Sequence, residues 1–312
     1  MSETQFTEQF MMETLKEQRR ARRWKIGFRL FFIAYFTGAL LIAAGVFKPD
    51  PDEVEQHVGV VDVKGMISGD KEASASADRI IAGLKRAFEA KNVSAVILNI
   101  DSPGGSPVQS ARVYREIMRL KGNDPDRKVI AVGGDLMASG AYYIASAADE
   151  IYADPTSIVG SVGVIMSSFG VTELMEKVGV QRRVFTAGSE KAFMDPFLEV
   201  SPTGMRTVGQ MLGDIHNVFI ADVKRGRGDK ITLPDEEVFN GLVWTGVRAQ
   251  SIGLIDGLGS PGEIARDKFG VDKMVDYTVQ PSPFERLAGR ISTELSMALT
   301  SMVESKVQLM AQ

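Results

Sequence analysis

The order of apolar and polar residues divides most of the chain into short apolar runs that alternate with longer amphipathic segments. Runs rich in valine and isoleucine are typical of buried strands, and apolar residues at intervals of three and four are typical of helices. The predicted strands are residues 57–67, 93–100, 129–132, 150–153, 164–166, 182–186 and 273–279. The predicted helices are residues 77–90, 108–120, 138–148, 171–177 and 203–224. This alternation predicts an α/β fold with a largely parallel sheet and helices on both faces.

An uncharged apolar run near the N-terminus, residues 30–47, departs from this pattern. As a helix it spans ~27 Å, close to the ~30 Å hydrocarbon core of a bilayer. Seven Lys and Arg residues precede it against four Asp and Glu, and this basic flank favours a transmembrane anchor over a buried helix of a soluble protein. By the positive-inside rule the N-terminus is then cytoplasmic and the chain after Lys48 lies across the membrane. A cleaved signal peptide is the alternative, but no clear A-x-A cleavage site follows the run.

The chain therefore divides into five parts. They are a basic segment (1–29), the anchor (30–47), a polar, proline-bearing linker (48–56), a folded domain (57–280) and a C-terminal segment (281–312). In the last part the apolar residues keep helical spacing, which predicts one amphipathic helix. Its apolar face can dock on the domain, on a neighbouring subunit or on the membrane, and the sequence does not choose among these.

The amino-acid composition excludes several kinds of catalytic and metal-binding site. The chain has no cysteine, which excludes a cysteine nucleophile, disulfides and thiolate zinc sites, and its two histidines, His57 and His216, disfavour a histidine-based metal cluster. The formal charge is −4, and because the first 29 residues carry +3, the remainder carries −7. A nucleic-acid partner is therefore disfavoured.

Residues 133–142, Gly-Gly-Asp-Leu-Met-Ala-Ser-Gly-Ala-Tyr, join a predicted strand to a predicted helix through a glycine turn. This places Ser139 at a helix N-terminus. Serine is a preferred N-cap there, because its oxygen accepts a hydrogen bond from the first turn. The same position also suits a nucleophile, because unpaired N–H groups and the positive end of the helix dipole favour an alkoxide or oxyanion.

Two further glycine turns lie next to predicted strands, at Ser102-Pro-Gly-Gly105 and at residues 160–163. Each can be a simple tight turn, since proline and glycine supply that geometry without any function. The functional alternative is an exposed backbone N–H facing a developing negative charge. The amide of Gly105, paired with that of Gly140, would complete a two-donor oxyanion hole beside Ser139.

A serine nucleophile needs a base, and neither histidine lies close in sequence to one of these turns. A lysine must be neutral to accept a proton, and an unperturbed lysine pKa near ~10.4 leaves almost none neutral at pH 7. Burial lowers a lysine pKa by up to ~3–5 units, so a basic lysine belongs in an apolar segment. Lys191, within residues 187–197, fits this better than any other lysine after the apolar run.

Five segments together resemble the signal peptide peptidase A family, serine peptidases with the ClpP/crotonase fold of repeated ββα units. The segments are Asp101-Ser-Pro-Gly-Gly105, Met137-Ala-Ser-Gly-Ala-Tyr-Tyr-Ile144, Gly160-Ser-Val-Gly-Val164, Lys191-Ala-Phe-Met-Asp-Pro-Phe197 and Gly241-Leu-Val-Trp-Thr-Gly246. They occur in the family's order over residues 57–280. One membrane span ahead of one such domain is similar to the short, half-length form of the family.

The resemblance implies a role for each motif. Ser139 is then the nucleophile, Lys191 the general base, Ser161 the hydroxyl that hydrogen-bonds the lysine, and Gly105 and Gly140 the oxyanion donors. The implied reaction is peptide hydrolysis through an acyl-enzyme, without a metal or cofactor. The implied substrates are remnant signal peptides and other hydrophobic or unfolded segments. The implied location is the bacterial cytoplasmic membrane, with the catalytic domain in the periplasm or otherwise outside the cytoplasm.

In double-length relatives the lysine and serine lie in different halves of one chain. The resemblance therefore implies that a half-length chain forms homo-oligomers whose sites are shared between subunits. Two alternatives remain: a crotonase-type acyl-CoA enzyme, which has the same fold and an oxyanion hole but no serine nucleophile, and a membrane scaffold without catalysis.

Overall fold

The computed structural model describes residues 3–43, 55–70 and 73–280. They belong to two compact units, Met1–Glu53 and Val54–Gln312, which are treated separately below. The predicted C-terminal helix (281–312) lies outside the described residues, as does nearly all of the predicted linker (48–56).

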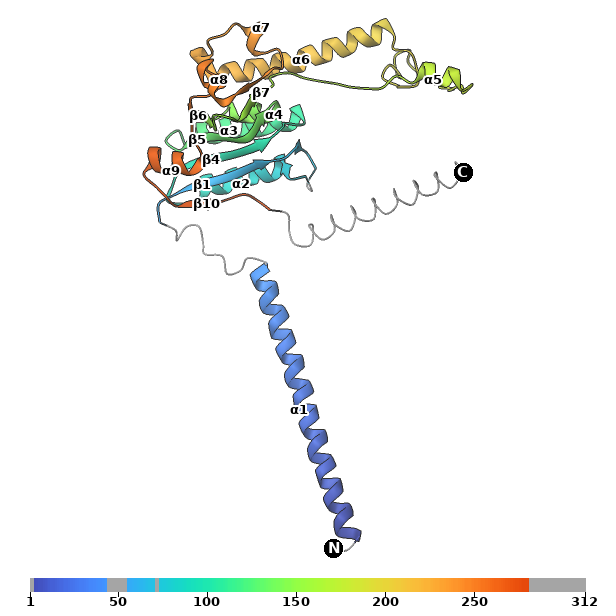
Figure 1. The fold of residues 1–312 in the computed structure, drawn as a ribbon, viewed down its shortest axis with the longest axis vertical. Coiled ribbons are helices and arrows are strands. Elements are labelled where there is room, and N and C mark those ends of the chain that lie inside the picture. The colour runs from blue at the N-terminus through green and yellow to red at the C-terminus, as the bar shows by residue number, and fades with distance from the viewer. Residues whose placement is uncertain (1–2, 44–54, 71–72, 281–312) are drawn as a thin grey trace. The chain divides into compact units, whose positions relative to one another are not determined.

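The first unit is one continuous helix, α1 (Glu3–Ala43), drawn in blue in Figure 1. The predicted anchor is helical as far as Ala43, and its last four residues lie outside the described part of the chain. By length and composition, the stretch Lys16–Ile42 is able to cross a membrane. Its aromatic side chains, among them Phe31 and Phe36, are exposed.

The second unit is built on an eight-stranded sheet whose central path runs in the order β10-β1-β4-β5-β6-β9. The strands are β1 (His57–Lys64), β4 (Val93–Ser102), β5 (Lys128–Ala138), β6 (Glu150–Ala153), β7 (Ile158–Gly160), β8 (Val243–Thr245), β9 (Gly257–Leu258) and β10 (Met274–Asp276), and β2 (Ile67–Ser68) with β3 (Ala75–Ser76) forms a separate pair. All pairings along the path are parallel, and so is that of β7 with β5. The short β8 adds to β7 in antiparallel orientation.

Helices cover both faces of this sheet (Figure 1). They are α2 (Ala77–Glu89), α3 (Pro107–Asn123), α4 (Gly140–Ala145), α5 (Thr172–Lys177), α6 (Pro202–Arg227), the 3₁₀ turn η2 (Gly228–Lys230), α7 (Asp235–Val238), α8 (Gly246–Ser251) and α9 (Pro261–Phe269). Strand β4 illustrates why: Val96 and Leu98 pack in a core with residues of α2, α3 and α4, whereas Ile97 packs in a second core with Ile264 of α9. Alternate residues face opposite cores, so a strand buried on both sides is apolar throughout. The predicted α/β fold is confirmed.

Helix α6 is anchored to the core mainly through its C-terminal half. Arg227 is buried there and pairs with Asp256, the closest N–O distance being 2.7 Å. Near the other end, Gly204 packs against Phe193 of the preceding segment. The buried residues of α6 are Gly204, Phe219, Asp222, Val223 and Arg227.

Residues 163–201, called the arm below, connect the region after β7 to α6. The arm contains α5, as predicted, but the strands predicted at 164–166 and 182–186 are wrong, because these residues form no ladder in the described chain. Residues 164–166 cannot pair with β7, because β8 already occupies its free edge. Ile165 and Phe185, although apolar, are 88% and 94% exposed. The helix predicted at 138–148 is also shorter than expected, ending at Ala145.

Candidate active site

Ser139 lies at the sharp turn between β5 and α4. Its backbone has φ +54° and ψ −124°, a conformation that non-glycine residues rarely adopt. Ser139 occupies the N-cap position, but its hydroxyl makes no capping hydrogen bond. The side chain is partly buried rather than covered. The hydroxyl is therefore available at a helix N-terminus, where the dipole favours negative charge.

Helix α4 is held rigidly behind Ser139, because all six of its residues are buried. The Tyr142 hydroxyl donates to the carbonyl of Leu254 at 2.7 Å, and the Tyr143 hydroxyl donates to Oδ2 of Asp222 on α6 at 2.5 Å. The Tyr143 ring also stacks on Phe219, with centroids 4.5 Å apart. Burial, and for Tyr143 also the Asp222 carboxylate, raises the pKa of both tyrosines, so both remain neutral donors.

The loop after β4 packs directly against the Ser139 turn, and glycine is required for this contact. Gly104 has φ +96°, and a Cβ built on it would lie 2.6 Å from the amide nitrogen of Gly140 and 2.8 Å from Cβ of Ser139. A Cβ built on Gly140 would in turn lie 3.3 Å from the amide nitrogen of Gly105. The two glycine segments therefore bring the predicted pair of oxyanion donors together.

Hydrogen bonds fix this loop without using those donors. The Ile67 amide donates to the Gly104 carbonyl at 2.8 Å, and the Ser106 amide donates to the Ile67 carbonyl at 2.9 Å. The Gly140 amide is at the first position of α4, where helix amides have no intrahelical acceptor. Among the hydrogen bonds between described residues, the amides of Gly105 and Gly140 donate none. Two unused amides next to a serine hydroxyl are the arrangement that stabilises a developing oxyanion.

Ser161 lies next to Ser139 across two parallel strands. The register pairs Ala138 of β5 with Gly160 of β7, and the Ser139 amide donates to the Gly160 carbonyl at 2.7 Å. Parallel neighbours lie about 4.8 Å apart, so Ser161 emerges beside Ser139 at the same sheet edge. Its own amide donates to the carbonyl of Leu242 at 2.7 Å.

Lys191 is not brought to this cluster within one chain. It is an exposed residue of the arm, and its amide donates to the Gly188 carbonyl at 3.2 Å. Its ammonium group has no hydrogen bond or ion pair with the described part of the chain. Figure 1 shows α5 at the end of α6 that lies away from the sheet. Four of the five predicted site residues thus converge, and the predicted base stands apart from them.

Comparison with known proteins identifies the fold as that of a peptidase. The model of peptidase family S49 matches residues 121–268, a region that includes Ser139, Ser161 and Lys191. The chain is 30% identical over 261 residues to "Putative protease slr0021" of Synechocystis sp., covering 80% of this chain and 89% of that protein. The chain belongs to peptidase family S49.

Two further relatives share part of their length with this S49 chain. The "Serine protease SPPA, chloroplastic" of Arabidopsis thaliana is 33% identical over 184 residues, which are 59% of this chain and 27% of that protein. The "Na(+)/H(+) antiporter NhaA" of Brucella abortus is 46% identical over 198 residues, which are 64% of this chain and 26% of that protein. The chain thus spans about a quarter of each of these relatives. Membership of family S49 confirms the resemblance inferred from the five motifs.

Two further residues lie beside the candidate site: Ser110, which the sequence analysis did not single out, and His216, which it set aside as a base. Ser110 of α3 is fully buried, and its hydroxyl donates to the Ser106 carbonyl at 3.1 Å. A Cβ on Gly140 would lie 2.4 Å from this hydroxyl, so Ser110 packs directly against Gly140. His216 of α6 lies 3.1 Å, through Nε2, from the carbonyl of Val162, the residue after Ser161. Neither position belongs to a local motif, because each is brought in by a helix that packs from elsewhere in the chain.

Proposed function

We propose that this S49 peptidase is a membrane-anchored endopeptidase that uses Ser139 as nucleophile and Lys191 as general base. The observation that carries the proposal is the Ser139 turn: a strained backbone, a hydroxyl without a capping bond, and two unused amides beside it. The proposed substrates are remnant signal peptides and other hydrophobic or unfolded segments near the membrane.

The proposed reaction has two steps. In the first, Lys191 accepts the Ser139 proton while Oγ attacks the peptide carbonyl, and the amides of Gly105 and Gly140 bind the resulting oxyanion. Collapse breaks the C–N bond, and the lysinium returns its proton to the leaving amine. In the second step, water attacks the acyl-enzyme with the same lysine as base, which releases the acid and restores the Ser139 hydroxyl. Ser161 holds the lysine amine in line by a hydrogen bond.

We further propose that the lysine comes from a second copy of the chain. The exposed position of Lys191 supports this, as do the apolar side chains of the arm, since Ile165, Phe169 and Phe185 are each nearly fully exposed. An apolar hollow of about 460 Å³ on the arm, lined in part by Leu174, Val178 and Phe197, adds to this surface. Exposed apolar side chains in such number on one segment are typical of a protein interface. A neighbouring copy would cover it and place Lys191 beside the Ser139 of its partner.

The proposed membrane anchor is α1, with the basic N-terminal segment in the cytoplasm and the peptidase unit on the outer side of a bacterial cytoplasmic membrane. The support is the uncharged run that begins at Leu30 and the basic residues that precede it. Single cysteines introduced on either side of the run test this topology, because the chain has no cysteine of its own.

Covalent labelling tests the catalytic assignment. We expect a fluorophosphonate to label the detergent-solubilised full chain, Ser139→Ala to abolish labelling, and Lys191→Ala to slow it severely. Lys177→Ala is the matched control, because Lys177 is another exposed lysine of the arm, and it should label at the wild-type rate. Labelling that survives Ser139→Ala would refute the nucleophile, and an inert wild-type chain would favour a scaffold without catalysis.

A further inference from the structure

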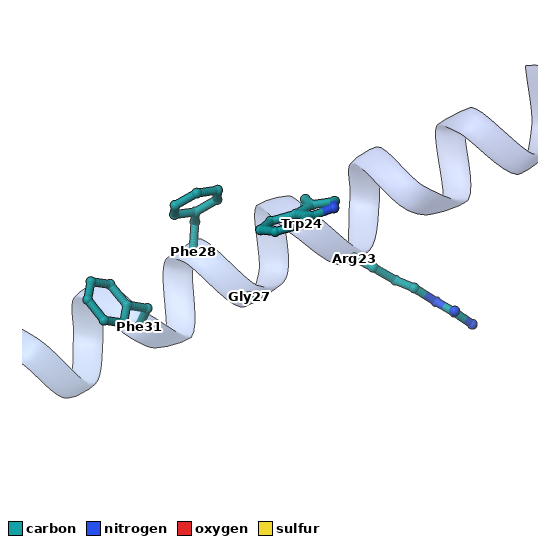
Figure 2. Close-up of a pocket in the computed structure, with 5 residues that line it drawn as sticks. All are labelled: Arg23, Trp24, Gly27, Phe28 and Phe31. Carbon is teal, nitrogen blue, oxygen red and sulfur yellow. The ribbon is translucent and has the colours of Figure 1, made fainter.

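One face of α1 changes from basic to aromatic along the helix axis. Arg20, Arg23, Gly27 and Phe31 follow one another at helical spacing, with Trp24 beside them. Figure 2 shows the guanidinium of Arg23 extending toward the N-terminal end and the three rings of Trp24, Phe28 and Phe31 standing along the helix beyond it. We call this surface, Arg20 to Phe31 on the Gly27 side, the Gly27 face.

The Gly27 face is hollowed at its centre. A hollow of about 430 Å³ is lined by Arg23, Trp24, Gly27, Phe28 and Phe31. A Cβ built on Gly27 would contact nothing within 4 Å, so the hollow exists because position 27 has no side chain. The rings of Trp24 and Phe28 stand together on one side of the hollow, with centroids 5.7 Å apart, and Arg23 extends from the other side. The result is an open hollow over Gly27, called the slot below, which is bordered by three aromatic rings and one guanidinium group.

The basic end of the face carries uncompensated charge. Within residues 16–42, whose side chains the structure describes, neither Arg20 nor Arg23 forms an ion pair with a carboxylate. Guanidinium groups bind phosphate oxygens through paired, parallel hydrogen bonds. Two such groups, separated by one helical turn, suit one phosphate or a pair of phosphates.

The depth of these residues matches the layers of a bilayer. The uncharged run begins at Leu30, after Arg29, so the boundary of the hydrocarbon core lies near Phe28 and Arg29. At 1.5 Å per residue, Trp24 and Arg23 then lie about 6 Å and 8 Å outside that boundary, within the headgroup layer. Trp at this level is typical of membrane interfaces. Phe31 lies on the hydrocarbon side.

We propose that the Gly27 face binds one anionic phospholipid of the surrounding bilayer, with its phosphate on Arg20 and Arg23 and one acyl chain in the slot over Gly27. This inference rests on the proposed membrane anchoring of α1. The occupant is argued from charge and depth together: the cations lie at headgroup level, and the hollow runs from that level across the boundary to Phe31 on the hydrocarbon side. A second copy of α1 would place like charges of Arg20 and Arg23 against each other, which disfavours it as the occupant.

Quenching of Trp24 fluorescence tests the proposal in the full chain. The chain has two tryptophans, so Trp244→Phe leaves Trp24 as the only indole. This variant is reconstituted into phosphatidylcholine vesicles containing an equal mole fraction of either phosphatidylglycerol or phosphatidylcholine with brominated chains. We expect the brominated phosphatidylglycerol to quench Trp24 at least twofold more strongly.

Paired variants separate a site from general charge attraction. Arg20→Gln with Arg23→Gln should lower the quenching ratio to one, whereas Arg22→Gln with Lys25→Gln, which removes the same charge from the opposite face, should preserve it. Gly27→Leu, which fills the slot, should also lower the ratio. Equal quenching by both lipids in the parent chain, or equal loss of the ratio in the two paired variants, would overturn the proposal.

Two further experiments distinguish failure of the lipid site from failure of the proposed membrane anchoring. Disulfide formation between copies carrying Gly27→Cys, together with a ratio of one, would show a second helix in the slot and overturn the lipid site. Extraction of the chain from vesicles by alkaline carbonate would show that α1 does not anchor, which refutes the proposed anchoring as well as this inference. An integrated chain without lipid selectivity would refute the lipid site alone.

Discussion

Ser139 and Ser161 lie side by side at the ends of two neighbouring parallel strands, and both have the same backbone φ of +54°. The Ser139 amide donates to the carbonyl of Gly160, directly before Ser161, so a backbone hydrogen bond joins the two turns. Positive φ is uncommon for serine and costs free energy, yet the fold applies it at both positions. Both residues directly follow their strands, at the sheet edge where Gly105 and Gly140 meet.

The first prediction concerns the Ser161 hydroxyl. Ser161→Ala should lower kcat/KM by about 10- to 100-fold, because a hydrogen bond to a charged group contributes about 1.5–3 kcal/mol. Ser161→Gly should cause a similar loss while preserving or raising the melting temperature, because glycine relieves the positive φ. Steady-state cleavage of a fluorogenic peptide and thermal unfolding measure the two effects. Wild-type activity in both variants would exclude a role for this hydroxyl in catalysis.

The second prediction concerns the contact between the two glycine segments. Gly104→Ala should lower activity by at least about 100-fold, because the new methyl group displaces the Gly140 amide and the Ser139 side chain. It should also destabilise the chain by about 2–4 kcal/mol through strain and overpacking. Gly122→Ala on α3, where a Cβ meets nothing within 4 Å, is the control and should be neutral or stabilising by up to about 1 kcal/mol. Peptide turnover measures the activity, and urea unfolding measures the stability. If Gly104→Ala and Gly122→Ala have the same activity and stability, the contact between the two glycine segments is contradicted.

The third prediction concerns acid stability and the pair Arg227–Asp256. Burial by itself raises the pKa of Asp256, but hydrogen bonds from Arg227 and Lys230 outweigh it and hold the pKa below its usual value. A depressed carboxyl pKa stabilises the fold above the unfolded-state pKa of about 3.9, and this contribution is lost as the pH falls through the folded-state pKa. Asp256→Asn should therefore cost about 3 kcal/mol at pH 7, because it leaves a buried guanidinium unpaired, and less in strong acid.

Urea unfolding across pH measures this difference. The control is Asp235→Asn, which breaks the exposed pair with Lys224 and should change stability by less than about 1 kcal/mol at any pH. If Asp256→Asn destabilises the chain as strongly in acid as at pH 7, the Arg227–Asp256 ion pair is not the cause of the destabilisation.

The fourth prediction concerns the shared site. Ser139→Ala and Lys191→Ala should each be inactive alone, and co-reconstitution of the two should restore activity, because mixed neighbours combine an intact serine with an intact lysine. Ser139→Ala mixed with Gly104→Ala should stay inactive, since both changes damage the same part of the site. Peptide cleavage in vesicles measures the recovery. Folded variants that never complement, or a monomeric chain with full activity in detergent, would contradict a site shared between copies.

The sequence predicted those parts of the fold whose signals are local. β4 is apolar along its length because both of its faces are buried, and the Ser139 turn is marked by glycines on either side. The position of Gly105 beside Gly140 followed from the rule that loops at the ends of parallel strands meet at one edge. These inferences need only a strand, its neighbours and the turn chemistry.

The arm could not be predicted in the same way. Residues 182–186 have the composition of a strand, but composition does not supply a neighbouring strand to bond with. Ser110 and His216 reach the site because α3 and α6 pack there, and nothing in their local sequence marks them. Under the proposed function, Lys191 acts on the Ser139 of a second copy of the chain. A local sequence pattern carries no information about a distance between two copies.

Helix α6 is packed into the core at its C-terminal end and extends away from it at its N-terminal end. Its 26 residues extend ~39 Å, with the clamped end at Phe219 to Arg227 and the free end bearing the arm. A tilt of about 5° at the clamp therefore displaces the tip by about 3 Å, whereas the turn at Ser139, held by buried contacts, stays where it is. Under the proposed function, the nucleophile Ser139 therefore lies on a rigid, buried part of the fold. Lys191 lies on the arm, where a small tilt of α6 would adjust its position relative to the partner copy.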